Sequence, residues 1–85
     1  MKTLIIALLL SFSALAEYDT IAINGKVIAT GDRAARLRDV AGEPDYVSEI
    51  RDGYGHKIGE TWEYKINGRY VTFDIYGGEI AEISD

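Results

Sequence analysis

The sequence predicts an α+β domain of two layers, in which a short helix packs on an antiparallel meander of three to four strands. Asn-Gly and Gly-Gly pairs separate runs of alternating apolar residues, which is typical of antiparallel hairpins. One segment, residues 33–41, instead has apolar residues at helical spacing. The meander that these turns define carries its large apolar residues on one face, which requires a cover, and the helix is the expected cover.

The first sixteen residues have the pattern of a secretory signal peptide. Lys2 precedes an apolar run from Leu4 to Leu10, and Ala14 and Ala16 occupy the minus-three and minus-one positions of a cleavage site. The run is too short for a spanning helix, and the chain has no cysteine to carry a lipid at the cut. We therefore expect cleavage near Ala16 and one periplasmic or secreted domain over residues 17–85, with neither a transmembrane nor a lipid anchor.

A small hairpin and the helix come next. The Asn-Gly pair at 24–25 lies between apolar pairs and predicts a hairpin over residues 21–28. Asp32 precedes the helical segment and is expected to cap it, and Gly42 suits the left-handed position past its end. A helix of two or three turns is not stable alone, so it requires a sheet to pack on.

The meander occupies the second half of the chain. Residues 46–51 form a strand whose facing the pattern does not settle, and a loop rich in glycine follows it. Strands over 61–66 and 69–76 are joined by an Asn-Gly turn, and a Gly-Gly turn at 77–78 precedes a last strand that ends near Ile83. Two-residue turns fix the register of each pair of strands.

This register assigns the side chains of the meander to two faces. It places three apolar pairs opposite each other: Trp62 and Phe73, Tyr64 and Val71, and Ile75 and Ile80. These six residues form the apolar face, which Leu37 and Val40 of the helix are expected to cover. The opposite face is expected to be solvated, and it carries Thr61, Glu63, Lys65, Tyr70, Thr72, Asp74, Tyr76 and Glu79.

Charge and cysteine content exclude several classes of function. The net charge is −5, and the loss of Lys2 with the leader makes it one unit more negative. An acidic surface argues against nucleic acid or an anionic membrane as the main partner. Without cysteine, disulfide scaffolds, iron–sulfur centres and cysteine nucleophiles are excluded. A domain this small has a barely sufficient core, so packing, a partner or self-association must supply the rest of its stability.

The chain contains no recognisable catalytic, cofactor or metal constellation, and we expect a protein that is not an enzyme and holds no cofactor or metal. His56 is the only histidine, so any hydrolytic triad or metal site would be built around it. An inert, solvated role for His56 and a metal or pH-sensing role both stay open. Glu63, Asp74 and Glu79 share the solvated face, but an open face does not tune carboxylates for acid–base catalysis.

The order of several short motifs provides a family resemblance. They are Gly31-Asp32, Gly42-Glu43-Pro44-Asp45, Glu60-Thr61-Trp62-Glu63-Tyr64, Val71-Thr72-Phe73 and Gly78-Glu79-Ile80. Over roughly residues 21–83 this order resembles a family of small exported bacterial proteins with a domain of unknown function. It is also distantly similar to the SmpA, OmlA and BamE-like domain of outer-membrane assembly lipoproteins. The resemblance implies helices on a three-stranded antiparallel sheet and an envelope-located binding module without known catalysis.

Exposed tyrosines indicate where a partner would bind. Tyrosine is favoured where proteins meet, although it is also common on solvated strands. The candidate partner-binding residues are Tyr54 and His56 in the loop and Lys65, Tyr70 and Tyr76 on the solvated face. We therefore expect a non-catalytic protein-binding module of the bacterial envelope, which contacts an envelope or secreted protein by its sheet face or by the loop from Gly53 to Gly59.

Two alternatives stay open. Small, acidic, exported chains also include inhibitors of secreted or periplasmic enzymes, and the BamE-like fold resembles that of a class of β-lactamase inhibitor proteins. An inhibitor would bury the Gly53 to Gly59 loop in a cleft. The strand from Tyr46, or the last strand, also leaves an edge that a partner or a second copy of the chain could extend, which would make a homodimer.

Overall fold

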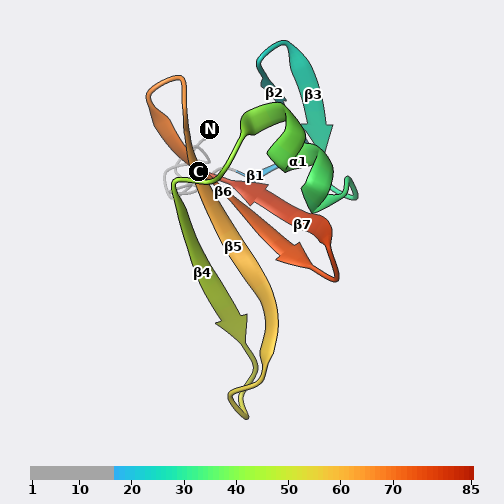
Figure 1. Cartoon of the computed structure of the whole chain (residues 1–85), viewed down its shortest axis with the longest axis vertical. Coiled ribbons are helices and arrows are strands. Elements are labelled where there is room, and N and C mark those ends of the chain that lie inside the picture. The colour runs from blue at the N-terminus through green and yellow to red at the C-terminus, as the bar shows by residue number, and fades with distance from the viewer. Residues whose placement is uncertain (1–16) are drawn as a thin grey trace, which may run out of the picture.

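The computed structural model describes residues 17–85, which form a mostly β domain (Figure 1). Strands make up 59% of this part of the chain, and one short helix, α1 (Ala34–Ala41), makes up 12%. The strands are β1 (Glu17–Tyr18), β2 (Thr20–Ile23), β3 (Lys26–Ala29), β4 (Tyr46–Arg51), β5 (Lys57–Ile66), β6 (Arg69–Tyr76) and β7 (Glu79–Ser84). The predicted signal peptide, residues 1–16, lies outside the described residues.

The predicted α+β class, a helix layer on a meander of three to four strands, is wrong. The strands form a five-stranded antiparallel sheet in the order β1-β7-β6-β5-β4, and β2 and β3 form a separate two-stranded sheet. The large sheet has five strands because β4 pairs with β5 along its whole length and β1 adds to β7 at the other edge. Helix α1 has eight residues, too few to cover such a sheet, and lies nearest to β3. Leu37 is its one buried residue.

The helix begins differently from the prediction. Arg33 occupies the N-cap position and makes no capping hydrogen bond with its side chain. The Asp32 carboxylate instead accepts a hydrogen bond of 2.8 Å from the backbone N–H of Ala29 and lies 3.6 Å from Arg36 Nε. The expected Asp32 cap is therefore wrong, because the side chain turns back to β3. Gly42 has a φ of 85°, and the helix ends there as predicted.

The turns and the strand register match the prediction. Both residues of the turns at 24–25, 67–68 and 77–78 have positive φ, between 52° and 81°. This is the conformation that two-residue hairpins favour, because its twist matches that of the strands. The predicted pairs Trp62–Phe73, Tyr64–Val71 and Ile75–Ile80 are confirmed. One residue, Ala81, is left without a partner on β6, which shifts the register of the rest of β7.

The hydrophobic core lies on one face of the large sheet, which we call the covered face because α1 and the β2–β3 hairpin pack against it. Its buried residues are Ile23, Ile28, Leu37, Trp62, Tyr64, Val71, Phe73, Ile75, Ile80 and Ile83. The Tyr64 and Phe73 rings meet edge to face, with centroids 5.6 Å apart. The other face of the sheet, which we call the open face, carries Thr61, Lys65, Tyr70 and Asp74.

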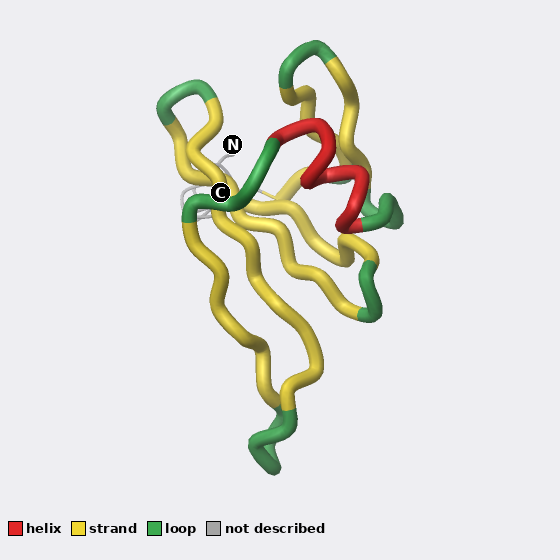
Figure 2. The backbone as a smooth tube through the Cα atoms, viewed as in Figure 1, coloured by secondary structure: helices red, strands yellow, loops and turns green. Residues whose placement is uncertain are grey.

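The β4–β5 hairpin extends away from the helix and from the β2–β3 hairpin (Figures 1 and 2). The β5 residues Lys57 and Ile58 have no partner on β6, because β6 ends at Tyr76. Residues 52–56 form the loop at the far end of the hairpin, which we call the tip (Figure 2). The fold therefore presents the far half of this hairpin as a two-stranded projection.

Candidate protein-binding site

The tip of the β4–β5 hairpin is an ordered loop that displays an aromatic side chain. The Asp52 carboxylate accepts hydrogen bonds from the backbone N–H groups of His56, at 2.9 Å, and Tyr54, at 2.8 Å. These bonds, the one from His56 foremost, hold the pKa of Asp52 below its usual range, because they stabilise the ionised carboxylate. The Tyr54 side chain is 88% exposed, so the loop presents this ring to solvent rather than burying it.

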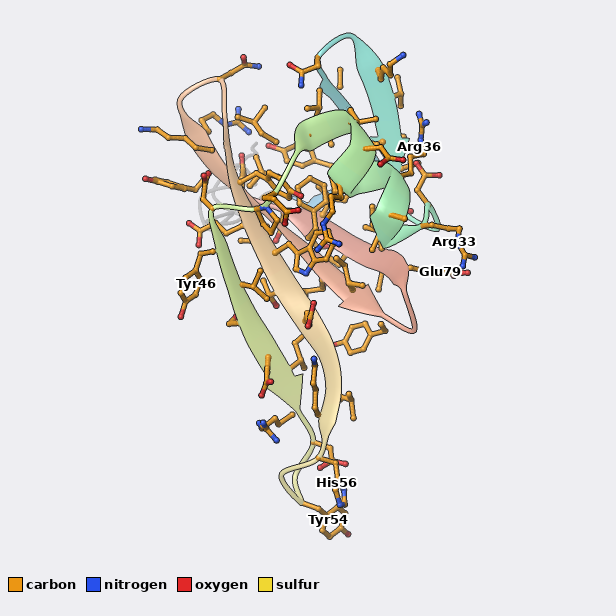
Figure 3. All side chains as sticks on the ribbon, viewed as in Figure 1. Arg33, Arg36, Tyr46, Tyr54, His56 and Glu79 are labelled. Atoms are coloured by element: carbon orange, nitrogen blue, oxygen red, sulfur yellow. The ribbon has the colours of Figure 1, made fainter. Side chains whose placement is uncertain are left out.

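His56 lies beside Tyr54 at the tip (Figure 3). The two ring centroids are 6.4 Å apart, and His56 Nδ1 is 3.3 Å from Asp52 Oδ2. The His56 side chain is 78% exposed. In the same loop, Arg51 Nη1 donates a 2.6 Å hydrogen bond to the carbonyl of Gly55. An exposed histidine in this setting helps to order the loop and adds a polar group beside the tyrosine.

The other three predicted residues lie on the open face. Lys65 lies opposite Tyr70, with its Nζ 5.6 Å from the ring centroid, a cation–π geometry. This pair stands next to the turn at 67–68, at the end of β5 remote from the tip. Tyr76 lies nearer the tip than this pair does, because its ring packs against Gly59 of β5. The five predicted residues therefore do not form one site: Tyr54 and His56 lie together, and Lys65 and Tyr70 lie elsewhere.

Sequence reasoning missed three exposed apolar residues of the hairpin. Tyr46 is 62% exposed, Val47 44% and Ile58 46%. Tyr46 belongs to the open face, and Figure 3 shows it pointing away from the sheet, whereas Val47 lies opposite Trp62 on the covered face. Apolar residues at the consecutive positions 46 and 47 are the signal that could have found this strand, because a strand with one buried face cannot bury both.

A groove of about 330 Å³ adjoins Ile58 on the covered face, and Trp62, Ile75 and Gly77 contribute to its lining. The Trp62 indole N–H donates a 2.8 Å hydrogen bond to Glu60, and the Arg38 guanidinium lies 4.7 Å from the Trp62 ring centroid. A hydrogen bond from Lys57, followed by the one from Trp62, lowers the pKa of Glu60. The charged groups beside this groove thus already have partners. The rest of the lining suits an apolar side chain.

The carboxylates on β1, β6 and β7 interact with each other and with a hydroxyl group. The Thr61 hydroxyl donates a 2.8 Å hydrogen bond to Asp74. A hydrogen bond with Glu17, together with the charge of Glu17, raises the pKa of Glu82. Across residues 17–85, no three His, Asp or Glu side chains are grouped so that they could hold a metal ion. What this part of the chain does provide is a set of exposed apolar side chains on the β4–β5 hairpin, on both of its faces and at its tip.

Within residues 17–85, no helix has the length and apolar character needed to cross a membrane.

Comparisons with models of protein families, with curated proteins and with solved structures find no match to this chain.

Proposed function

We propose that this chain is a non-catalytic protein-binding module of the bacterial envelope, which contacts an envelope or secreted protein through the β4–β5 hairpin. The observation that carries the proposal is the number of large apolar side chains that this one element leaves exposed. Tyr46 on the open face, Val47 and Ile58 on the covered face and Tyr54 at the tip are all exposed. An element that leaves several large apolar residues exposed is typical of a site where another protein binds.

The order of the tip supports a binding role. Two backbone N–H groups are fixed by Asp52, and Arg51 holds the Gly55 carbonyl. A loop that is already ordered loses little conformational entropy when it binds, which favours affinity. The Lys65 and Tyr70 pair lies at the end of β5 remote from the tip, where Tyr46 is its exposed apolar neighbour on the open face. We assign this pair no part in the contact that the tip makes.

The sequence supports the location and the class of partner in this proposal. The leader predicted over residues 1–16 supports export, and the acidic net charge argues against nucleic acid as the partner. The proposed contact requires no cofactor or metal, because apolar burial supplies the affinity.

Inhibition of a secreted or periplasmic enzyme is the second candidate function. The observation that favours it is the projection of the ordered tip, with Tyr54 at its end, beyond the rest of the sheet (Figure 3). A projecting rigid loop is suited to a cleft, whereas a docking module would also use the strands below the tip. The two functions therefore differ in whether Tyr46 and Val47 contribute to binding.

Capture from an envelope extract with the tagged full chain tests the proposal. We expect a captured protein that is displaced by untagged chain and is lost with Tyr54→Ser and with Ile58→Ser. Tyr70→Ser is the matched control, since it removes an exposed tyrosine that lies opposite Lys65, at the end of β5 remote from the tip. Capture no higher than background with the unaltered chain, or equal capture by all variants, contradicts the proposal. If deletion of residues 53–55 abolishes capture while Tyr46→Ser and Val47→Ser do not, the inhibitor function is favoured.

A further inference from the structure

The two edges of the five-stranded sheet differ in whether other parts of the chain cover their backbone hydrogen-bonding groups. At the β7 edge, the Gly31 N–H donates a 2.8 Å hydrogen bond to the Ile80 carbonyl, and the Ile80 N–H donates one of 2.9 Å to the Asp32 carbonyl. Further along the same edge, Tyr18 of β1 pairs with Ile83. The chain therefore occupies the backbone hydrogen-bonding groups at both ends of β7.

The β4 edge has no such cover from the described residues. Strand β4 pairs with β5 on one side and is the last strand of the sheet on the other (Figure 1). Alternate N–H and C=O groups of an edge strand point away from the sheet and can pair with another strand. Each β4 residue takes part in the pairing with β5, and the extra residue of the register shift, Ile58, belongs to β5. The outer edge of β4 is thus regular.

We propose that β4 of a second copy of this chain pairs there, antiparallel, about a two-fold axis at Ser48. The two sheets would then form one continuous sheet with the same face open in both copies. Tyr46 would lie opposite Ile50 of the second copy, and an aromatic residue opposite a β-branched one is a favourable cross-strand pair.

The neighbouring registers are less favourable. The axis must pass through a residue, because a pairing offset by one residue would place the open face of one copy beside the covered face of the other. An axis at Glu49 places this carboxylate opposite its own copy, and like charges directly opposite each other are destabilising. An axis at Val47 places Tyr46 opposite Ser48 and so loses the pair of Tyr46 with Ile50, which makes the axis at Ser48 preferable.

The distribution of acidic residues is compatible with this dimer. The interacting carboxylates Glu17 and Glu82 lie on β1 and β7, at the far side of the sheet from β4, and Asp74 lies on the central strand β6. Two copies joined at β4 therefore keep these groups apart, which limits the repulsion between two acidic chains.

The dimer goes beyond the proposed function. It would cover Tyr46, so that Val47, Tyr54 and Ile58 remain for the envelope partner, and it would leave both tips free at opposite ends of the joined hairpins, because the two β4 strands run antiparallel. A module with two separated tips can bind two sites at once, which raises its apparent affinity for a repetitive or dimeric target.

Single cysteines test the register, since the chain has none of its own. Residues that face each other across antiparallel strands have Cα atoms about 4.5–5.5 Å apart, which is within the range that a disulfide spans. We expect the full chain with Ser48→Cys to form disulfide-linked dimers under mild oxidation. Tyr46→Cys alone and Ile50→Cys alone should stay unlinked, whereas an equal mixture of the two should link to each other.

Three results of the cysteine experiment would overturn the dimer. The first is a Ser48→Cys chain that stays unlinked while its circular dichroism matches that of the unaltered chain. The second is equal linking by all three single variants, which indicates random collision. The third is linking of Ser48→Cys only to another protein of an envelope extract, which indicates that a different partner extends β4.

Sedimentation over a range of concentrations gives an independent measurement without cysteines. The unaltered chain should dimerise, and Ser48→Lys should weaken the dimer by about fivefold, because two like charges face each other at the axis. Val27→Lys adds the same charge on the β2–β3 hairpin and should leave the dimer unchanged. A monomer at every concentration overturns the inference, but it leaves the Tyr54-dependent capture that tests the proposed function unaffected.

Discussion

The ring of Tyr76 lies against Gly59, at the place where β5 passes the end of β6 and becomes part of the two-stranded projection. A Cβ atom at Gly59 would lie 2.9 Å from Tyr76 Cδ1 and 2.5 Å from the carbonyl oxygen of Ile75. Glycine at this position therefore lets the ring cover the backbone of β5 on the open face. The contact joins the part of β5 next to the projection to β6.

Gly59→Ala should destabilise the domain by about 1–3 kcal/mol, because the new methyl group meets a backbone oxygen that cannot move freely. Gly53→Ala is the matched control: it lies in the same hairpin, and a Cβ there meets nothing within 4 Å. Urea unfolding of both variants measures the difference. Equal loss of stability in the two variants would contradict this account of the contact.

Asp52→Ala should loosen the tip. The amide protons of Tyr54 and His56, which are bonded to Asp52, should exchange faster with solvent, as measured by hydrogen exchange. The folded chain lowers the pKa of Asp52 from 3.8, so its contribution is complete above that pH and is lost as the pH falls below it. Asp19→Ala, remote from the tip, should leave both amides unchanged. Unchanged exchange in Asp52→Ala would show that the loop is ordered by other contacts.

Tyr64→Phe should change both stability and its alkaline pH dependence. At neutral pH the variant loses the 2.8 Å hydrogen bond from Tyr64 to the Gly42 carbonyl, at a cost of about 0.5–1.5 kcal/mol. Burial raises the pKa of Tyr64 from 10.0 to about 12. The unfolded chain therefore loses its proton first, and the stability from the neutral phenol is lost as the pH rises from 10.0 towards the folded pKa.

Urea unfolding at neutral pH and near pH 11 checks both parts of this prediction. The unaltered chain should lose more stability between the two conditions than Tyr64→Phe does. Tyr70→Phe, which alters an exposed tyrosine, should behave like the unaltered chain. An identical alkaline loss in all three chains would place the titrating group elsewhere.

Leu37→Ala should destabilise the domain by about 2–5 kcal/mol, because it leaves a cavity in the core. Leu37 is fully buried, and it is the one buried residue of α1. A loss of this size is a large part of the stability of a small domain. Val27→Ala removes an exposed side chain and should cost little. Thermal unfolding followed by circular dichroism compares the two, and a small effect of Leu37→Ala would mean that α1 can detach without loss of the sheet.

Turn chemistry made the register predictable, because an Asn-Gly or Gly-Gly pair between apolar strands allows few geometries. The pairing of Trp62 with Phe73 follows directly from the turn at 67–68. The fold class was not predictable in the same way. The two residues of β1 have no pattern of their own, and they are strand only because β7 lies beside them. The helix was predicted to cover the sheet, but only Leu37 of its eight residues is buried.

The candidate site was predicted in part. The flanking glycines indicated that Tyr54 is exposed, and the structure confirms this. The hydrogen bonds that order the tip depend on the orientation of Asp52, which residue spacing alone does not specify. Tyr46 and Val47 were missed, because the facing of an edge strand depends on its neighbour, and β4 has only one.

Site-specific photo-crosslinking tests the central claim, that the β4–β5 hairpin contacts another protein, most directly. A photoreactive amino acid replaces Tyr54 in the full chain, which is produced in its native host and irradiated in intact cells. We predict a discrete adduct whose mass differs from that of two copies of the chain, and no such adduct when the same group replaces Val27 or Tyr70. A folded, exported chain that gives no adduct from position 54, or gives one only from positions 27 or 70, would contradict the account.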